Sequence, residues 1–151
     1  MMHVSPHSFR PEPAQADAAA QPVPPLTPAG YFRRRRLHAD LTIPKLVDRL
    51  VREAARRDET IQRDEAIALI HQLETDGITA MRRETISRIA DVMPLDAAVY
   101  WQLKLDPANH PQICHGCGYT VWDAYSVEDM LLGWATATSC TRCTPLTDAD
   151  L

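Results

Sequence analysis

Two pairs of cysteines near the C-terminus constrain this 151-residue chain more than any other feature. The sequence C-H-G-C-G runs from Cys114 to Gly118, and C-T-R-C runs from Cys140 to Cys143, with 22 residues between Cys117 and Cys140. A C-x-x-C turn brings two thiolates onto one ion, and glycine after the second cysteine permits the positive φ of such a turn. Two such turns predict one closed, four-sulfur Zn²⁺ site with a structural role.

Other uses of paired cysteines fit this pattern less well. Disulfides are typical of secreted chains, but the Pro/Ala-rich N-terminus lacks the apolar core of a signal peptide, so we expect a cytoplasmic location. A thioredoxin-like redox site needs one C-x-x-C pair at a helix N-terminus and no second pair. A catalytic zinc ion needs an open coordination position, which four cysteines do not leave, and no other catalytic constellation is visible. We therefore expect a protein that is not an enzyme.

The charges divide unevenly along the chain. Residues 31–104 contain 14 Lys and Arg against 12 Asp and Glu, whereas residues 105–151 contain one Arg against six acidic residues. Because nucleic-acid affinity depends on neutralising phosphates, any DNA contact is expected within residues 31–90. The acidic C-terminal module is expected to contact a protein partner or a second copy of the chain. No apolar run approaches the roughly 20 residues of a membrane span, so no membrane partner is expected.

Composition and periodicity predict three parts. Residues 1–30 hold seven of the twelve prolines and few large apolar side chains, which predicts a disordered segment. Residues 31–106 are predicted to form a helical domain with a basic arm at its start, and residues 107–151 the four-cysteine zinc-binding module. The fold class is therefore mainly α, a small helical bundle followed by the zinc module. The predicted helices are 43–57 with Thr42 as N-cap, 61–75 ended by Gly77, 83–93 closed by Pro94, and 94–104.

Two groups of basic residues are candidate nucleic-acid contacts. The first is the run of four arginines that follows Tyr31 and Phe32, which is either a phosphate-contacting arm or a solvated hinge. The second is on helix 83–93, since a glycine turn followed by Thr-Ile-Ser-Arg is similar to a helix-turn-helix, although three extra residues lengthen the turn. The alternative is an ordinary bundle helix with outward arginines. The candidates are Arg33, Arg34, Arg35, Arg36, Arg82, Arg83, Thr85, Ser87 and Arg88.

The segment between the two cysteine pairs contains the candidate protein interface. Residues 119–122 are predicted to form a short strand, and Ser126 followed by two acids predicts a helix from 126 to about 137 that is inserted into the zinc module. Trp122 and Trp134 are expected either to cover the site or to anchor a protein partner.

The cysteine spacing resembles that of two families of regulators. C-x-x-C-G, a helical segment and a second C-x-x-C are similar to the TraR/DksA-type RNA-polymerase-binding proteins, and the stretch from Cys140 to Pro145 is similar to the FlhC-type flagellar activator subunits. These resemblances imply a small zinc-containing regulator of transcription. The hypothesis is a regulator that contacts DNA through its helical domain and a protein through its zinc module, and the alternative is an adaptor or inhibitor without a DNA contact.

Overall fold

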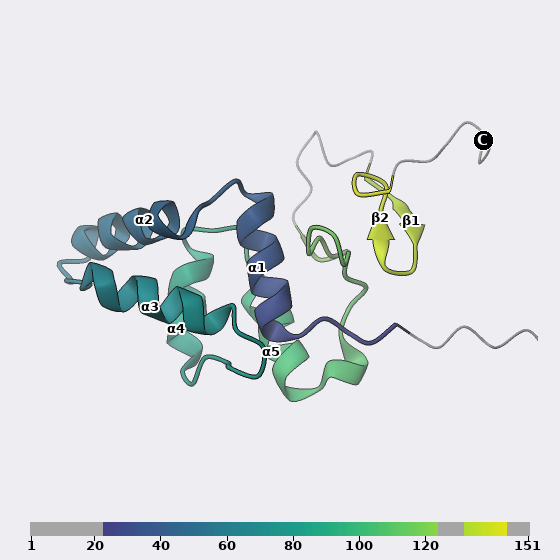
Figure 1. The fold of residues 1–151 in the computed structure, drawn as a ribbon, viewed down its shortest axis with the longest axis horizontal. Coiled ribbons are helices and arrows are strands. Elements are labelled where there is room, and N and C mark those ends of the chain that lie inside the picture. The colour runs from purple at the N-terminus through teal and green to yellow at the C-terminus, as the bar shows by residue number, and fades with distance from the viewer. Residues whose placement is uncertain (1–22, 124–131, 145–151) are drawn as a thin grey trace, which may run out of the picture.

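The computed structural model describes residues 23–123 and 132–144, which form a mainly helical domain followed by a small cysteine-rich module (Figure 1). The predicted fold class is confirmed in this respect. The elements are α1 (Pro28–His38), α2 (Ile43–Arg56), α3 (Arg63–Leu73), α4 (Arg83–Ala90), α5 (Ala97–Leu105), a 3₁₀ turn (Pro107–Asn109), and strands β1 (Trp134–Thr136) and β2 (Ser139–Cys140).

Side-chain caps fix where α2 and α5 begin, and the cap of α2 was predicted. The Thr42 side chain accepts a hydrogen bond from the backbone N–H of Lys45, as predicted, and Pro44 occupies the first turn of α2. Asp96 caps α5 in the same way through the N–H groups of Ala98 and Val99. None of the described helices combines the length and apolarity that a membrane crossing requires.

One apolar core joins the five helices. Its fully buried side chains include Phe32 from α1, Leu46 from α2, Ile70 from α3, Ile86 from α4 and Val99 from α5. Helix α2 packs against α3, and α1 packs against α5. Burying these side chains is the main favourable term for the domain, since each large apolar side chain contributes about 1.5–3 kcal/mol.

Helix α1 differs from the predicted basic arm. Thr27 caps it, and Leu26 and Ala29 are buried, so the helical domain starts before Tyr31. The Tyr31 side chain is fully buried, and its hydroxyl accepts a hydrogen bond from the Asp96 N–H at 3.1 Å. The arginine-rich segment is therefore a helix that packs against the rest of the bundle through its buried side.

The helix 83–93 is shorter than predicted. Helix α4 ends at Ala90, and Met93 is buried in the turn before Pro94. Helix α3 ends at Leu73, and the connection to α4 spans residues 74–82, with Gly77 at φ +85°. This connection is longer than the turn of a helix-turn-helix.

Arg36 ties α1 to α3 inside the domain. Its Nε and Nη2 atoms donate to the two carboxylate oxygens of Glu74 at 2.5 and 2.9 Å, and its Nη1 atom donates to the Leu41 carbonyl at 2.6 Å. The Arg36 side chain is buried, and the Glu74 side chain is only 11% exposed. In a bidentate ion pair of this kind, each charge compensates the other, so removal of either partner destabilises the fold.

We expect Arg36→Ala to lower the free energy of unfolding by about 3–5 kcal/mol, because it leaves the Glu74 carboxylate buried without a cation. Urea unfolding measures the change. The matched control is Arg56→Ala, which breaks an exposed pair with Glu53 and should cost less than about 1 kcal/mol. The double variant Arg36→Met/Glu74→Leu should restore most of the stability, and equal losses in the Arg36 and Arg56 variants would contradict the assigned role.

Candidate metal centre

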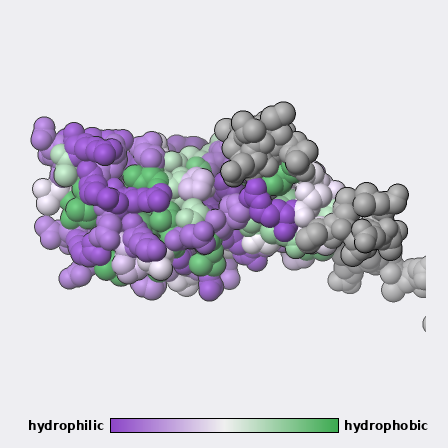
Figure 2. Space-filling view, turned by 90° about the horizontal axis from the view of Figure 1, so that it is seen from above, coloured by the Kyte–Doolittle hydropathy of each residue, from purple (hydrophilic) through white to green (hydrophobic). Residues whose placement is uncertain are grey.

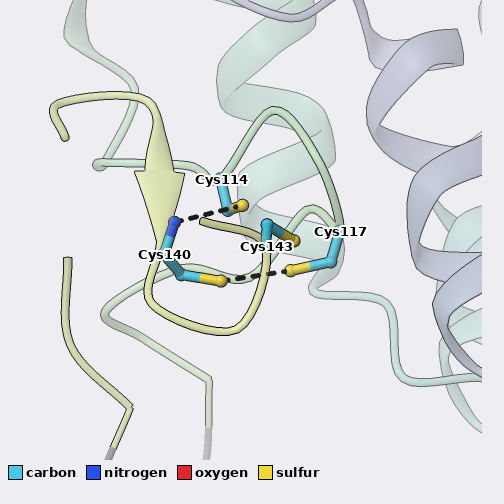
Figure 3. A group of neighbouring side chains, drawn as sticks. All are labelled: Cys114, Cys117, Cys140 and Cys143. Atoms are coloured by element: carbon cyan, nitrogen blue, oxygen red, sulfur yellow. Dashed lines mark hydrogen bonds between the residues drawn. The ribbon is translucent and has the colours of Figure 1, made fainter. Parts of the chain in front are cut away.

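The four predicted cysteine ligands converge in space (Figure 3). Their sulfur atoms all lie within 4.8 Å of one another, and none of the four is in a disulfide. The Sγ atoms of Cys117 and Cys140 are 3.8 Å apart, which is about the sulfur–sulfur distance of a tetrahedral site with zinc–sulfur bonds near 2.3 Å. Cys114, Cys117 and Cys140 are buried, and Cys143 is exposed. The cluster has the donor set and spacing to bind one metal ion.

The first C-x-x-C turn is closed by its own backbone. The Gly118 N–H donates to the Cys114 carbonyl at 2.8 Å, and the Cys114 N–H donates to the Tyr119 carbonyl at 2.8 Å. Gly118 has φ +76°, as the sequence predicted for this position. Gly116 is required for a different reason: a Cβ atom there would lie 2.7 Å from the Cys143 sulfur. Its lack of a side chain lets the second turn approach.

The second turn follows a short hairpin. Strands β1 and β2 pair antiparallel, with Trp134 opposite Cys140, and the N–H groups of Cys143 and Thr144 both donate to the Cys140 carbonyl. The His115 N–H donates to the Thr138 carbonyl at 2.8 Å, which connects the two turns. The hairpin therefore fixes the position of the second cysteine pair relative to the first.

The surroundings give the thiols different acidities. Burial raises the pKa of Cys114, but the N–H groups of Cys140, Cys117 and Gly116 outweigh it and lower that pKa to about 6. Burial, together with the neighbouring thiolates, raises the pKa of Cys117, and burial raises the pKa of Cys143 to about 11. The site thus holds one thiolate readily, and a bound cation would favour the charged form of the others.

The module is fastened to α1 by two of the arginines that were predicted to contact nucleic acid. Arg34 Nε donates to the His115 carbonyl inside the first cysteine turn, and Arg35 Nη2 pairs with the Asp123 carboxylate at 3.2 Å. A Cβ atom on Gly118 would lie 2.7 Å from Arg35 Cδ, so the turn packs directly on the α1 side chain. These contacts join the metal centre to the helical domain.

The other candidate nucleic-acid residues lie in different environments. Arg35 and Arg36 are only 6% and 7% exposed and donate to Pro94, Asp123, Glu74 and Leu41, so neither guanidinium is available on the surface. This corrects the expectation that all four consecutive arginines form an exposed arm. Arg88 is engaged with Glu59 and Glu84. Thr85 is half-buried, and Arg33, Arg82, Arg83 and Ser87 are exposed.

The two tryptophans of the module differ in exposure. Trp134 is half-buried and packs on Tyr119, with ring centroids 6.0 Å apart, whereas Trp122 is 54% exposed. Of the predicted strand 119–122, only Thr120 makes a β-bridge, with Ile113.

The helix predicted for 126–137 needs a correction at its C-terminal end. Residues 124–131 lie outside the described residues, but 134–136 form strand β1. The strand pairs with β2 in the hairpin that carries Cys140, and this pairing could not be predicted from the Ser126 cap and the two acids on which the helix prediction rested.

No protein-family model matches this chain, and no curated protein or solved structure shows significant similarity to it. The resemblances in cysteine spacing therefore remain resemblances of a motif.

Replacing Gly118 by Ala should test the docking of the module on α1. An L-residue at positive φ costs about 1–2 kcal/mol of stability. The new Cβ atom would also clash with the Arg35 side chain, which Pro94 and Asp123 hold in place. The matched control is Gly77→Ala, which has φ +85° but no atom within 4 Å of the new Cβ. We expect thermal unfolding to show a stability loss at least about 1 kcal/mol larger for Gly118→Ala, and equal losses would contradict the close contact.

Proposed function

We propose that the four cysteines hold one structural Zn²⁺ ion. Four thiols at the spacing of a tetrahedral sulfur site are the donor set that zinc prefers, and the four would fill its coordination sphere. Such an ion would order the cysteine turns and would have no position left for a substrate or an activated water. On this basis the protein is a binding protein, not an enzyme.

We further propose that this protein is a small zinc-binding regulator of transcription, whose helical domain contacts DNA and whose zinc module contacts a protein partner. The observation that carries the proposal is the closed four-cysteine cluster packed on a helical domain that still has exposed arginines. Arg33, Arg82 and Arg83 are exposed among the candidates named from the sequence, and Ser87 lies on the exposed side of α4.

A specific observation favours the second candidate function, a protein–protein adaptor or inhibitor without a DNA contact. Trp122 lines a groove of about 630 Å³ between the helical domain and the module, together with Met93, Pro94 and Tyr119. The groove has a mixed polar and apolar lining, and an exposed tryptophan in such a groove is the kind of side chain in which binding energy concentrates. In this alternative, Arg34, Arg35 and Arg36 act through their contacts within the molecule.

The zinc proposal predicts the behaviour of cysteine variants. We expect Cys114→Ser or Cys140→Ser to lose the one zinc ion per chain and to unfold residues 112–144, because the module has little apolar core of its own. Metal analysis and the NMR spectrum of the module measure both effects. His115→Ala, which removes a side chain outside the cluster, should keep the zinc ion. A metal-free serine variant with an intact module would contradict the proposal.

Binding of the zinc-loaded protein to random duplex DNA separates the two candidate functions. A regulator with phosphate contacts should bind at about 50 mM salt and lose affinity steeply by about 200 mM, because counterions compete for the phosphates. Fluorescence anisotropy with labelled duplex measures this dependence. Absence of binding at low salt would favour the adaptor. Capture of partners with the 151-residue chain and with its Trp122→Ala variant would then be the next comparison.

A further inference from the structure

We propose that the exposed face of α2 is the surface that contacts duplex DNA. This inference rests on the proposed function, in which the helical domain meets DNA. Four basic residues recur on α2 at helical spacing, namely Lys45, Arg49, Arg52 and Arg56, and all four are exposed. At 3.6 residues per turn they lie within an arc of about 60° and extend along about 16 Å of the helix axis. We call this set the α2 basic stripe.

The charges of the stripe are largely free for a partner. Lys45 makes no ion pair with any described residue. Arg49 and Arg52 donate only to backbone carbonyls, those of Val92 at 3.0 Å and Asp48 at 3.3 Å, which do not neutralise their charge. Arg56 forms an exposed pair with Glu53, which is weak in water.

The carboxylates that border the stripe already have partners among other arginines. Asp48 pairs with Arg63, and both Glu53 and Asp91 pair with Arg57. Arg57 and Arg63 therefore compensate the acidic side chains, while Lys45, Arg49 and Arg52 do not. The result is a local excess of positive charge on a chain whose overall formal charge is −4.

The surface beside the stripe has room for an anion. A polar groove of about 310 Å³ lies between α2 and the turn after α4, lined by Arg49, Arg52, Glu53, Arg56, Asp91 and Val92. Arginine presents a planar fork of donors that fits two phosphate oxygens at once. The view from above in Figure 2 shows a mostly hydrophilic surface over the helical domain, with smaller hydrophobic areas.

Two properties favour DNA over an anionic membrane as the partner. A membrane-bound helix must place its apolar side in the bilayer, but the apolar side of α2, including Leu46, Val47 and Leu50, is buried in the core. The length of the stripe, about 16 Å, exceeds the rise of four base steps of about 3.4 Å, so its ammonium and guanidinium groups can reach successive phosphates. The stripe thus fits a phosphate backbone without any apolar insertion.

The test compares two double variants that remove equal charge from the zinc-loaded 151-residue chain. Lys45→Gln/Arg52→Gln changes the stripe without breaking a tertiary hydrogen bond, because Arg52 donates only within its own helix. The control, Arg33→Gln/Arg82→Gln, removes two exposed arginines outside α2, which form the competing DNA surface among the candidates named from the sequence. Zinc content and melting temperature should equal those of the wild type in both variants. A further variant, Arg49→Gln, tests the residue that lines the groove.

Anisotropy titrations with random duplex at about 50 and about 200 mM salt give the readout. Each lost phosphate contact lowers the salt slope by about 0.9, and the stripe variant loses two contacts. The drop in its affinity between the two salt concentrations should therefore be about twelvefold smaller than the drop for the wild type. Because the inference places the phosphate contacts on α2 and not on Arg33 and Arg82, the control should keep the wild-type slope. Arg49→Gln should lower the slope by about 0.9, the value for one phosphate contact.

Other outcomes would overturn the inference in distinguishable ways. If only the control variant loses its salt slope, the stripe is not the DNA surface, but the proposed regulator still contacts DNA. If the wild type shows no salt-dependent DNA binding, both the inference and the DNA contact of the proposed function are wrong. Binding to vesicles that contain phosphatidylserine, with the same dependence on Lys45 and Arg52 and no DNA binding, would assign the stripe to a membrane surface.

Discussion

The guanidinium groups of α1 hold the parts of this molecule together. Arg36 reaches the Glu74 carboxylate at the end of α3, Arg35 reaches the Pro94 carbonyl before α5, and Arg34 reaches the His115 carbonyl in the first cysteine turn. Because consecutive residues on a helix point in different directions, a short run of arginines on one helix can bind three separate segments. All three contacts are partly buried, so they help to hold α3, the start of α5 and the module against this one helix.

The metal centre and α1 support each other through the first cysteine turn. The carbonyl that accepts from Arg34 and the glycine that packs on Arg35 both belong to the turn that carries Cys114 and Cys117. Under the zinc proposal, metal binding orders this turn and so also presents the surface that docks on the helix. Structural zinc contributes about 10–16 kcal/mol in small modules, which exceeds what a few hydrogen bonds supply, so the metal would dominate the folding of the module.

Much of the fold could be predicted from local patterns. The Thr42 cap, the apolar stripe of α2, the positive φ of Gly118 and the convergence of the four cysteines follow from residue type and local spacing. The end of α3 does not, because the helix stops at Leu73 with Glu74 as its C-cap, before the predicted stop at Gly77. The burial of Arg35 and Arg36 could not be predicted in this way, because their partners Asp123 and Glu74 lie 88 and 38 residues away. A run of arginines is ordinarily solvated, and only the tertiary arrangement of its acceptors makes a buried position favourable.

The density of positive charge in the sequence does not indicate where positive charge lies on the surface of this protein. The densest run of positive charge, Arg33–Arg36, has two of its four side chains buried, so its charge is partly neutralised within the fold. The α2 basic stripe is dispersed over twelve positions of sequence and interrupted by acids, yet helical periodicity gathers it on one exposed side, and Arg57 and Arg63 engage the bordering carboxylates. A surface that binds a polyanion is therefore better predicted by basic residues that recur at helical spacing, on a helix whose apolar side is buried, than by a continuous run of them. A run of arginines beside aromatic residues can instead stabilise the fold from within. The aromatic side chains pack in the core and place the helix there, so that the arginines lie close to backbone carbonyls and carboxylates that accept their hydrogen bonds.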